Sequence, residues 1–223
     1  MIKHLKNLKL LNQIMTKINF TSGIILSGGK SQRMNYPKAM LSWGDSILIN
    51  YQIISLFNAG CSEVVVVTGK DHEVISKNII KNNNLKLVYN SSYEKGKTTS
   101  IKSGLEKVSD ISDTIMIIAV DQPRPPHIIK KLIEFHNNNN FDITYPIYKK
   151  RGGHPLIFAK KMLPELLKIS ENKKGIREIF NNQNFTHGKL DFASMIVRVD
   201  INTIEDYERA KLDFDNIEEI SIE

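Results

Sequence analysis

Short apolar runs alternate with segments of helical spacing along most of the chain. Apolar runs, several of them rich in β-branched residues, predict buried strands at residues 23–26, 63–68, 85–89 and 114–120. Apolar positions three or four apart predict the helices that separate and follow these strands, at residues 47–59, 72–81, 98–108 and 125–137. This alternation predicts an α/β fold, with a mostly parallel sheet flanked by helices.

The second half of the chain has a less regular pattern. Further strands are expected at residues 142–148, 155–158 and 195–199, and further helices at residues 163–169, 175–181 and 203–214. Asn202 or Thr203 is expected to cap the last helix. We expect a single domain over residues 21–215, preceded by a basic N-terminal extension at residues 1–20 and followed by a C-terminal tail at residues 216–223.

A basic loop that contains two glycines follows the first predicted strand. Gly28 and Gly29 let the backbone come close to phosphate oxygens, because glycine has no side chain and adopts dihedral angles that other residues avoid. Three cations follow within nine residues, at Lys30, Arg33 and Lys38. Arginine can bind two phosphate oxygens at once and lysine acts as a point charge, so the loop predicts a triphosphate site.

Two better-known glycine loops fit this segment less well. The dinucleotide motif G-x-G-x-x-G is excluded, because Gly28 and Gly29 are adjacent and no third glycine follows. The P-loop pattern G-x-x-x-x-G-K-[ST] ends in Gly29-Lys30-Ser31 here, but five residues rather than four separate Gly29 from Gly23. A P-loop NTPase therefore remains the main competing interpretation.

Polar residues follow several of the predicted strands. Asp121 comes directly after a buried run, and Asn90 follows the strand at residues 85–89. Ligands bind beyond the carboxyl ends of such strands, so these residues and the glycine loop should meet in one crevice. Magnesium prefers oxygen ligands shared with phosphates, which makes Asp121 a candidate ligand, with Asp200 or Asn202 completing the set.

Two further loops carry candidate binding residues. Between residues 93 and 105, Gly96, Thr99 and Ser100 offer N–H and hydroxyl groups that, together with Asn90, could contact a base or ribose. Ordinary helix capping by threonine explains this loop equally well. Arg151 and His154 lie in a tight turn with glycine and proline, a setting that favours binding of the second substrate over a core position.

Composition excludes several classes of function. The net charge of +7 suits anionic ligands, but basic residues are scattered and do not alternate with aromatic ones, so nucleic-acid binding is not expected. Cys61 is the only cysteine, which excludes an intrachain disulfide and fits a cytoplasmic location. No apolar run reaches the length of a membrane span, so no membrane association is expected.

Residues 26–38 resemble the signature L-x-G-G-x-S-x-R-M-G-x-[PD]-K of MobA-like NTP transferases. Four further blocks of that family follow in the same order: Glu94 to Gly96 with Ser100 and Gly104, Val120 to Pro123, Gly153 to Pro155, and Asp200 to Thr203 with Glu205 and Asp206. The resemblance spans residues 23–211 and implies a Rossmann-like, GT-A-like nucleotidyltransferase domain. In the signature, Asn35 replaces a glycine.

The resemblance also implies a set of site residues and a Mg²⁺ cofactor. The implied catalytic residues are Lys38, Arg33 and Asp121, and the implied metal ligands are Asp121, Asp200 and Asn202. Arg151 and His154 would face a phosphorylated acceptor. The implied nucleotide-binding residues are Leu26, Ser27, Gly28, Gly29, Lys30, Arg33, Lys38, Asn90, Gly96, Thr99 and Ser100.

Within the family, the blocks most resemble the molybdenum cofactor cytidylyltransferase (MocA-like) branch. The Val120 to Pro123 and Gly153 to Pro155 blocks and the segment 173–177 carry this likeness. It implies CTP and molybdopterin as substrates, and a molybdoenzyme or chaperone as a protein partner. The guanylyltransferase branch is the alternative, since the pair Gly28-Gly29 is commoner there. A sugar- or polyol-phosphate nucleotidyltransferase and a nucleotide-binding regulator without turnover also remain open.

Overall fold

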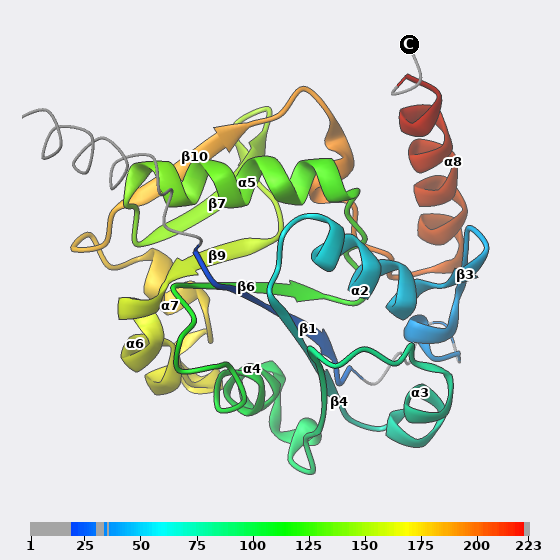
Figure 1. Ribbon diagram of the computed structural model, residues 1–223, viewed down its shortest axis with the longest axis horizontal. Coiled ribbons are helices and arrows are strands. Elements are labelled where there is room, and N and C mark those ends of the chain that lie inside the picture. The colour runs from blue at the N-terminus through cyan, green and yellow to red at the C-terminus, as the bar shows by residue number, and fades with distance from the viewer. Residues whose placement is uncertain (1–18, 30–33, 35, 221–223) are drawn as a thin grey trace, which may run out of the picture.

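The computed structural model describes residues 19–29, 34 and 36–220 of the 223-residue chain. Helices cover both faces of a central sheet (Figure 1). The sheet has eight strands in the order β10-β7-β9-β6-β1-β4-β5, with β8 paired to β7. The predicted α/β class with a mostly parallel sheet is therefore confirmed.

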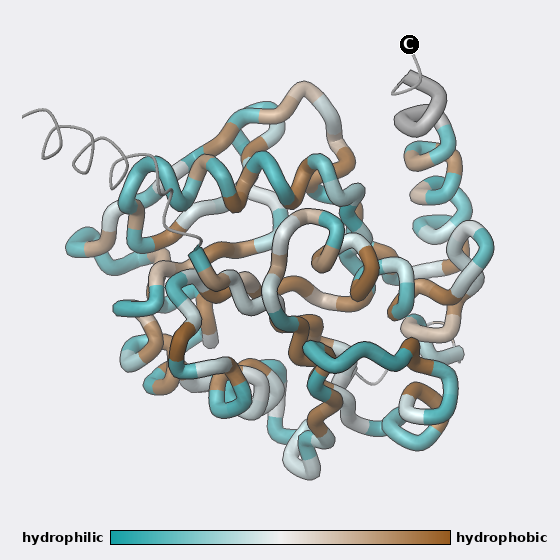
Figure 2. The backbone as a smooth tube through the Cα atoms, viewed as in Figure 1, coloured by the Kyte–Doolittle hydropathy of each residue, from teal (hydrophilic) through white to brown (hydrophobic). Residues whose placement is uncertain are grey.

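The three central strands are buried along their whole length. They are β1 (Thr21–Ser27), β4 (Glu63–Thr68) and β6 (Thr114–Ala119), and β5 (Leu85–Tyr89) extends the sheet beyond β4. All four run parallel to one another. Their β-branched residues suit a pleated surface that is covered on both faces, and Figure 2 shows hydrophobic stretches along this part of the chain.

Separate groups of helices cover the two faces. α2 (Leu48–Asn58) and α5 (Pro126–Asn139) contact each other on one face, whereas α4 (Lys97–Leu105) packs on β1 and β4 from the other. α6 (Leu163–Lys168) contacts α4, while α7 (Arg177–Phe180) and α3 (His72–Asn78) are short. Side chains of consecutive strand residues point to opposite faces, so Ile24 and Ile25 belong to different core clusters.

The second half of the chain extends the sheet beyond β6. β9 (Leu156–Ala159) lies between β6 and β7 (Ile143–Tyr148) and is antiparallel to both. The two-residue strand β8 (Arg151–Gly152) turns back along β7. The predicted strands at residues 142–148 and 155–158 are confirmed within a residue or two at each end.

In this half, one segment was assigned wrongly from the sequence and one strand was not predicted. The segment predicted as a strand at residues 195–199 is the 3₁₀ helix η5 (Met195–Arg198), capped by the Ser194 hydroxyl, which accepts the Ile196 N–H. A short apolar run does not distinguish a strand from a buried helical turn. β10 (His187–Asp191) was not predicted, because this mostly polar edge strand, with the sequence His-Gly-Lys-Leu-Asp, has no apolar run.

The C-terminal helix α8 (Ile204–Ile220) continues beyond its predicted end. Thr203 caps it as expected: its hydroxyl accepts the Asp206 N–H, and an Asp206 carboxylate oxygen accepts the Thr203 N–H. The β2 (Ser42–Trp43) and β3 (Ser46–Ile47) hairpin lies against α8, where Trp43 packs edge-on to Phe214 with ring centroids 4.9 Å apart. Within the described ranges, no helix is both long and apolar enough to cross a membrane.

Candidate functional site

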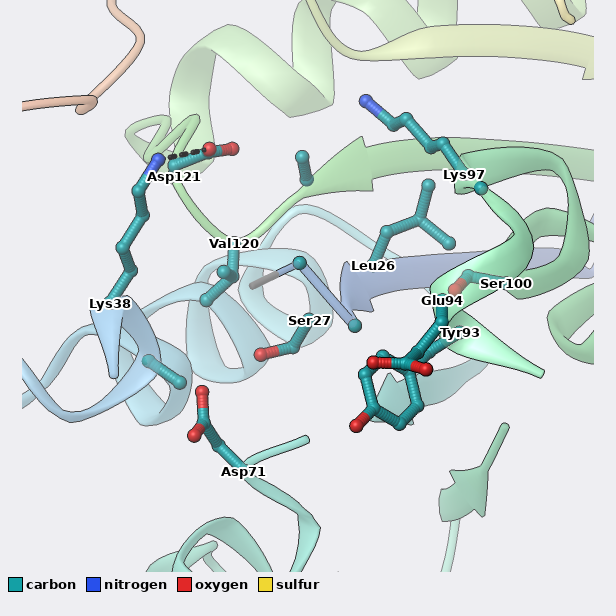
Figure 3. Close-up of a pocket in the computed structure, with 15 residues that line it drawn as sticks. Leu26, Ser27, Lys38, Asp71, Tyr93, Glu94, Lys97, Ser100, Val120 and Asp121 are labelled. Atoms are coloured by element: carbon teal, nitrogen blue, oxygen red, sulfur yellow. Dashed lines mark hydrogen bonds and ion pairs between the residues drawn. The ribbon is translucent and has the colours of Figure 1, made fainter. Parts of the chain in front are cut away.

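A cavity of about 360 Å³ opens where the strand order of the sheet reverses. From β1 the chain adds β4 and β5 on one side, and then returns to place β6 on the other side. Parallel sheets bind ligands outside the carboxyl ends of their strands at such a reversal. Figure 3 shows the cavity, which is lined by Leu26, Ser27, Gly28, Gly29, Lys38, Ala39, Asp71, Tyr93, Glu94, Gly96, Lys97, Ser100, Ala119, Val120 and Asp121.

Lys38 joins three distant segments at one end of this cavity. It begins the 3₁₀ helix η1 (Lys38–Met40), directly after Pro37. Its Nζ donates to Asp121 Oδ2 at 2.8 Å and to Asn202 Oδ1 at 3.1 Å. Only 12% of the Lys38 side chain and 22% of the Asp121 side chain is exposed. A partly buried ammonium thus holds together the two oxygen-bearing side chains that the sequence singled out.

Buried hydrogen bonds fix the segment that carries Asp121. Gln52, on α2, donates through Nε2 to the carbonyls of Ala119 and Val120 at 2.9 and 2.8 Å. The Asp121 carbonyl accepts the N–H of Ile201 at 2.8 Å, which ties the end of β6 to the segment that leads to Asn202. Because these contacts are between buried or backbone groups, they limit the movement of Asp121 relative to Asn202.

Arg124 is a fully buried arginine directly beyond this turn. Its guanidinium donates to the carbonyls of Pro123, His154 and Val197 at 2.6, 2.9 and 2.9 Å. Burial lowers the pKa of Arg124 to about 9, although the nearby Asp200 and Asp121 charges oppose the shift. Arg124 therefore connects the loops of Asp121 and His154 with the helix that precedes Asp200. Sequence reasoning missed it, and its only signal was a cation between two prolines beside Asp121.

A hydrogen-bonded loop forms the opposite wall, between β5 and α4. Asn90 donates through Nδ2 to Thr99 Oγ1 at 2.8 Å and to Ser100 Oγ at 3.0 Å. Gly96 has a φ of +119°, a conformation that side chains disfavour. Gly96 and Ser100 line the cavity, while Asn90 and Thr99 lie behind them and hold the loop in place.

The remaining predicted site residues occupy different places. Leu26, Ser27, Gly28 and Gly29 line the cavity at the end of β1. Lys30 and Arg33 lie outside the described residues. His154 lines a neighbouring cavity of about 30 Å³, which shares Leu26, Lys97 and Ala119 with the main one. Arg151 is exposed on β8 and lines neither cavity.

Four polar residues of the cavity were not singled out as ligand contacts, although three of them lie in the loop at residues 93–105 that was expected to contact a base or ribose. Asp71 follows β4, and Tyr93, Glu94 and Lys97 lie between β5 and the first turn of α4. Figure 3 shows Lys38 and Asp121 on one side of the cavity, with Asp71 below Lys38, and Lys97, Tyr93 and Glu94 on the other side. Their positions after strand ends were the available signal, since ligand contacts gather there in parallel sheets.

The model of the MobA-like NTP transferase domain matches residues 23–187, which is most of the chain. The chain belongs to the MobA-like NTP transferase family. It is therefore a nucleotidyltransferase, as the sequence blocks implied.

Relatives agree with this membership, and solved structures share the fold. A Bacillus cereus (strain Q1) protein named "Probable molybdenum cofactor guanylyltransferase" is 28% identical over 204 residues, which cover 87% of this chain and 98% of the relative. The crystal structure of Rv0371c from Mycobacterium tuberculosis H37Rv superposes with a TM-score of 0.76 at 20% identity, covering 87% of this chain and 99% of that one. Its complex with manganese gives a TM-score of 0.72 at 20% identity, covering 86% and 98%.

Asp121, Asp200 and Asn202 are the metal ligands predicted from the sequence, and their oxygen atoms are of the kind that a hard divalent cation prefers. Burial and the nearby Asp121 charge raise the pKa of Asp200, while the charges of Lys38, Lys97 and Arg124 oppose the shift. Two carboxylates that repel each other favour a cation between them. In the described part of the chain, no three His, Cys, Asp or Glu side chains gather as a metal site. The Asn202 amide oxygen and substrate phosphates would therefore have to complete the coordination.

Proposed function

We propose that this MobA-like enzyme transfers a nucleoside monophosphate from a magnesium-bound NTP to the phosphate group of a small acceptor. The observation that carries the proposal is Lys38 between Asp121 and Asn202, at the end of a cavity whose wall includes Gly28 and Gly29. A nucleotide phosphate chain requires groups of these kinds. Glycine backbone and a lysine can bind its phosphate oxygens, and oxygen donors can bind the accompanying cation.

The proposed reaction is a direct displacement at phosphorus. An acceptor phosphate oxygen attacks the α-phosphorus of the NTP and forms a new P–O bond. The bond between the α-phosphorus and the oxygen that bridges to the β-phosphorus breaks, and pyrophosphate leaves with the electron pair. The acceptor supplies its own electron pair, so no protein nucleophile is required. The enzyme contributes positioning and charge neutralisation, which dominate catalysis of this kind.

Each charged group of the site has a task in this scheme. Lys38 donates to the α-phosphate and stabilises the charge that develops there, while Lys30 and Arg33 bind the β- and γ-phosphates. Asp121, Asp200 and Asn202 would hold Mg²⁺, which would neutralise phosphate charge. The manganese complex of the structurally similar Rv0371c supports a divalent cation in this fold.

We further propose molybdopterin as the acceptor and CTP as the nucleotide. The relatives are named for the molybdenum cofactor, which supports an acceptor of the molybdopterin type, and the Val120 to Pro123 and Gly153 to Pro155 blocks support CTP. GTP is a second candidate, favoured by the name of the Bacillus cereus relative and by the pair Gly28-Gly29. A molybdoenzyme or its chaperone would then receive the product.

Calorimetry with CTP, GTP, ATP and UTP in the presence of Mg²⁺ tests nucleotide choice. We expect CTP to bind most tightly to the wild-type protein and its affinity to fall in Asp121→Asn, which removes one charge without changing shape. Asp45→Asn is the matched control, because Asp45 is exposed in the β2–β3 turn away from the cavity. Preference for GTP would assign the guanylyltransferase reaction instead, and failure to bind any NTP would contradict the proposed function.

A further inference from the structure

Lys97 stands between the main cavity and the small cavity that contains His154. It is the first residue of α4 and lines both cavities. Figure 3 shows its side chain running from the wall opposite Lys38 toward the end of the cavity where Lys38 and Asp121 meet. Lys97 therefore borders both the nucleotide cavity and the side on which acceptor-binding residues were predicted.

The ammonium of Lys97 makes no hydrogen bond or ion pair with any residue that the structure describes, and the residue is exposed. Lys38, by contrast, already donates to Asp121 and Asn202. The charge of Lys97 nevertheless acts on its surroundings. It contributes, after burial and Arg124, to a His154 pKa of about 3, and it opposes the rise in the pKa of Asp200.

The proposed reaction requires a cation on the acceptor side. An acceptor phosphate and an NTP are both highly charged anions that repel each other. A cation near the acceptor phosphate lowers this repulsion and lets the two substrates come together. Lys38 and Lys97 are the only cations among the described residues that line the main cavity. His154 is neutral at working pH because of its low pKa, and Arg151 lies outside both cavities.

The N-terminus of α4 does not replace this cation. The N–H of Thr98, in its first turn, already donates to Glu171 Oε1 at 2.7 Å. An acceptor phosphate at this wall would therefore meet a backbone donor that is in use, and beside it a lysine side chain with its donors available.

We propose that Lys97 binds the phosphate group of the acceptor and holds it opposite Lys38 for attack on the nucleotide. This inference rests on the proposed function, since it assumes that an NTP occupies the main cavity. Lys97 is then a catalytic residue that contacts the second substrate, and it supplies the positive charge that neither His154 nor Arg151 provides there.

The test compares Lys97→Gln, which removes the charge, with Lys97→Arg, which keeps it. Lys95→Gln is the matched control, because this exposed lysine lies two residues earlier and lines neither cavity. For each protein, steady-state pyrophosphate release with molybdopterin gives KM for the acceptor. Calorimetry with an α,β-methylene analogue of the preferred NTP, which cannot react, gives the nucleotide Kd. Urea denaturation checks that stability is unchanged.

We expect Lys97→Gln to raise the KM for molybdopterin about ten- to hundredfold, the range for a lost charged hydrogen bond, with the nucleotide Kd changed less than about twofold. Lys97→Arg should recover most of the loss, and Lys95→Gln should match the wild type. An unchanged acceptor KM in Lys97→Gln, or an equal loss of nucleotide affinity, would overturn the inference while leaving the proposed function intact. Absence of pyrophosphate release by the wild type would overturn both.

Discussion

The hydrogen bonds of Lys38 show how single residues set up this site. Its ammonium is shared by Asp121 Oδ2 and Asn202 Oδ1. Anionic phosphate oxygens would compete for the same donor, and a divalent cation would compete for the same acceptors. Binding of a nucleotide or of a metal ion would therefore change the hydrogen bonds of this one side chain.

Lys38→Ala should lower turnover by about two to three orders of magnitude. The ammonium that this variant removes should stabilise the transition state more strongly than it stabilises the complex with bound NTP. NTP affinity should fall far less. Initial rates of pyrophosphate release, together with calorimetric Kd values, separate the two effects. Turnover comparable to that of the wild type would refute the assigned contribution of Lys38.

Gly28 lies close to the side chain of Ser100. A Cβ at this position would lie 2.8 Å from Ser100 Oγ, which accepts a hydrogen bond from Asn90. Gly28→Ala should therefore displace Ser100 and weaken NTP binding by about 1 kcal/mol, the typical value of one hydrogen bond. Adding Ser100→Ala makes room for the methyl group, so the double variant should bind better than the sum of the single losses predicts. Additive losses in calorimetry would show that the two residues do not interact.

At the scale of elements, the site depends on loops that belong to different parts of the sheet. Arg124 donates to carbonyls of the loop after β6, of the loop before β9 and of η5. Gln52 on α2 donates to the carbonyls at the end of β6. These contacts place Asp121 beside the segment that carries Asp200 and Asn202, although about 80 residues separate them in sequence. Long-range buried hydrogen bonds thus bring residues of separate local motifs together in one site.

Arg124→Met should destabilise the fold by roughly 3 kcal/mol or more, because three buried carbonyls lose their donor. The unfolding free energy from urea denaturation measures this loss. Lys131→Met serves as the control, since Lys131 is an exposed cation on the neighbouring helix α5. Equal stabilities for the two variants would contradict the linking function of Arg124.

The sequence predicted the elements of the first half of the chain well and those of the second half less well. Runs such as Val64 to Val67 are continuous and apolar because β4 is covered on both faces, so the strands were recognisable. β10 and η5 were missed or misassigned, because an edge strand has little apolar signal and a short apolar run fits several structures.

The candidate site was only partly accessible to sequence reasoning, for a related physical reason. Gly28, Lys38 and Asp121 belong to local motifs and could be found directly. Arg124 binds carbonyls of segments far away in sequence, and Lys97 lines two cavities whose other residues come from distant segments, which no spacing rule reveals.

At the scale of the whole molecule, stability should depend on pH through buried histidines. Burial lowers the pKa of His136 on α5 to about 4, although Asp142 opposes the shift, and its Nδ1 lies 2.8 Å from Thr144 Oγ1 of β7. The unfolded chain takes up this proton near pH 6.5 and the folded protein only near pH 4. The unfolded state therefore binds more protons in this window, and stability falls as the pH is lowered through it.

His136→Gln should remove part of this dependence. Each pKa unit of difference corresponds to about 1.4 kcal/mol, so the variant should lose less unfolding free energy than the wild type between pH 6.5 and pH 4. Urea denaturation at several pH values measures the slope. His127→Gln, at an exposed position on the same helix where partial burial and Lys131 also lower the histidine pKa, should reduce the slope less than His136→Gln does. Identical slopes for all three proteins would contradict the buried, neutral state of His136.

The proposed function is the joining of a nucleoside monophosphate to a phosphorylated acceptor. To test it, the protein is incubated with Mg²⁺, molybdopterin and either CTP or GTP, and pyrophosphate and the dinucleotide product are quantified together. We expect equal amounts of both with one of the two nucleotides, and neither without molybdopterin. Release of nucleoside diphosphate and inorganic phosphate, or nucleotide binding without any pyrophosphate, would contradict it.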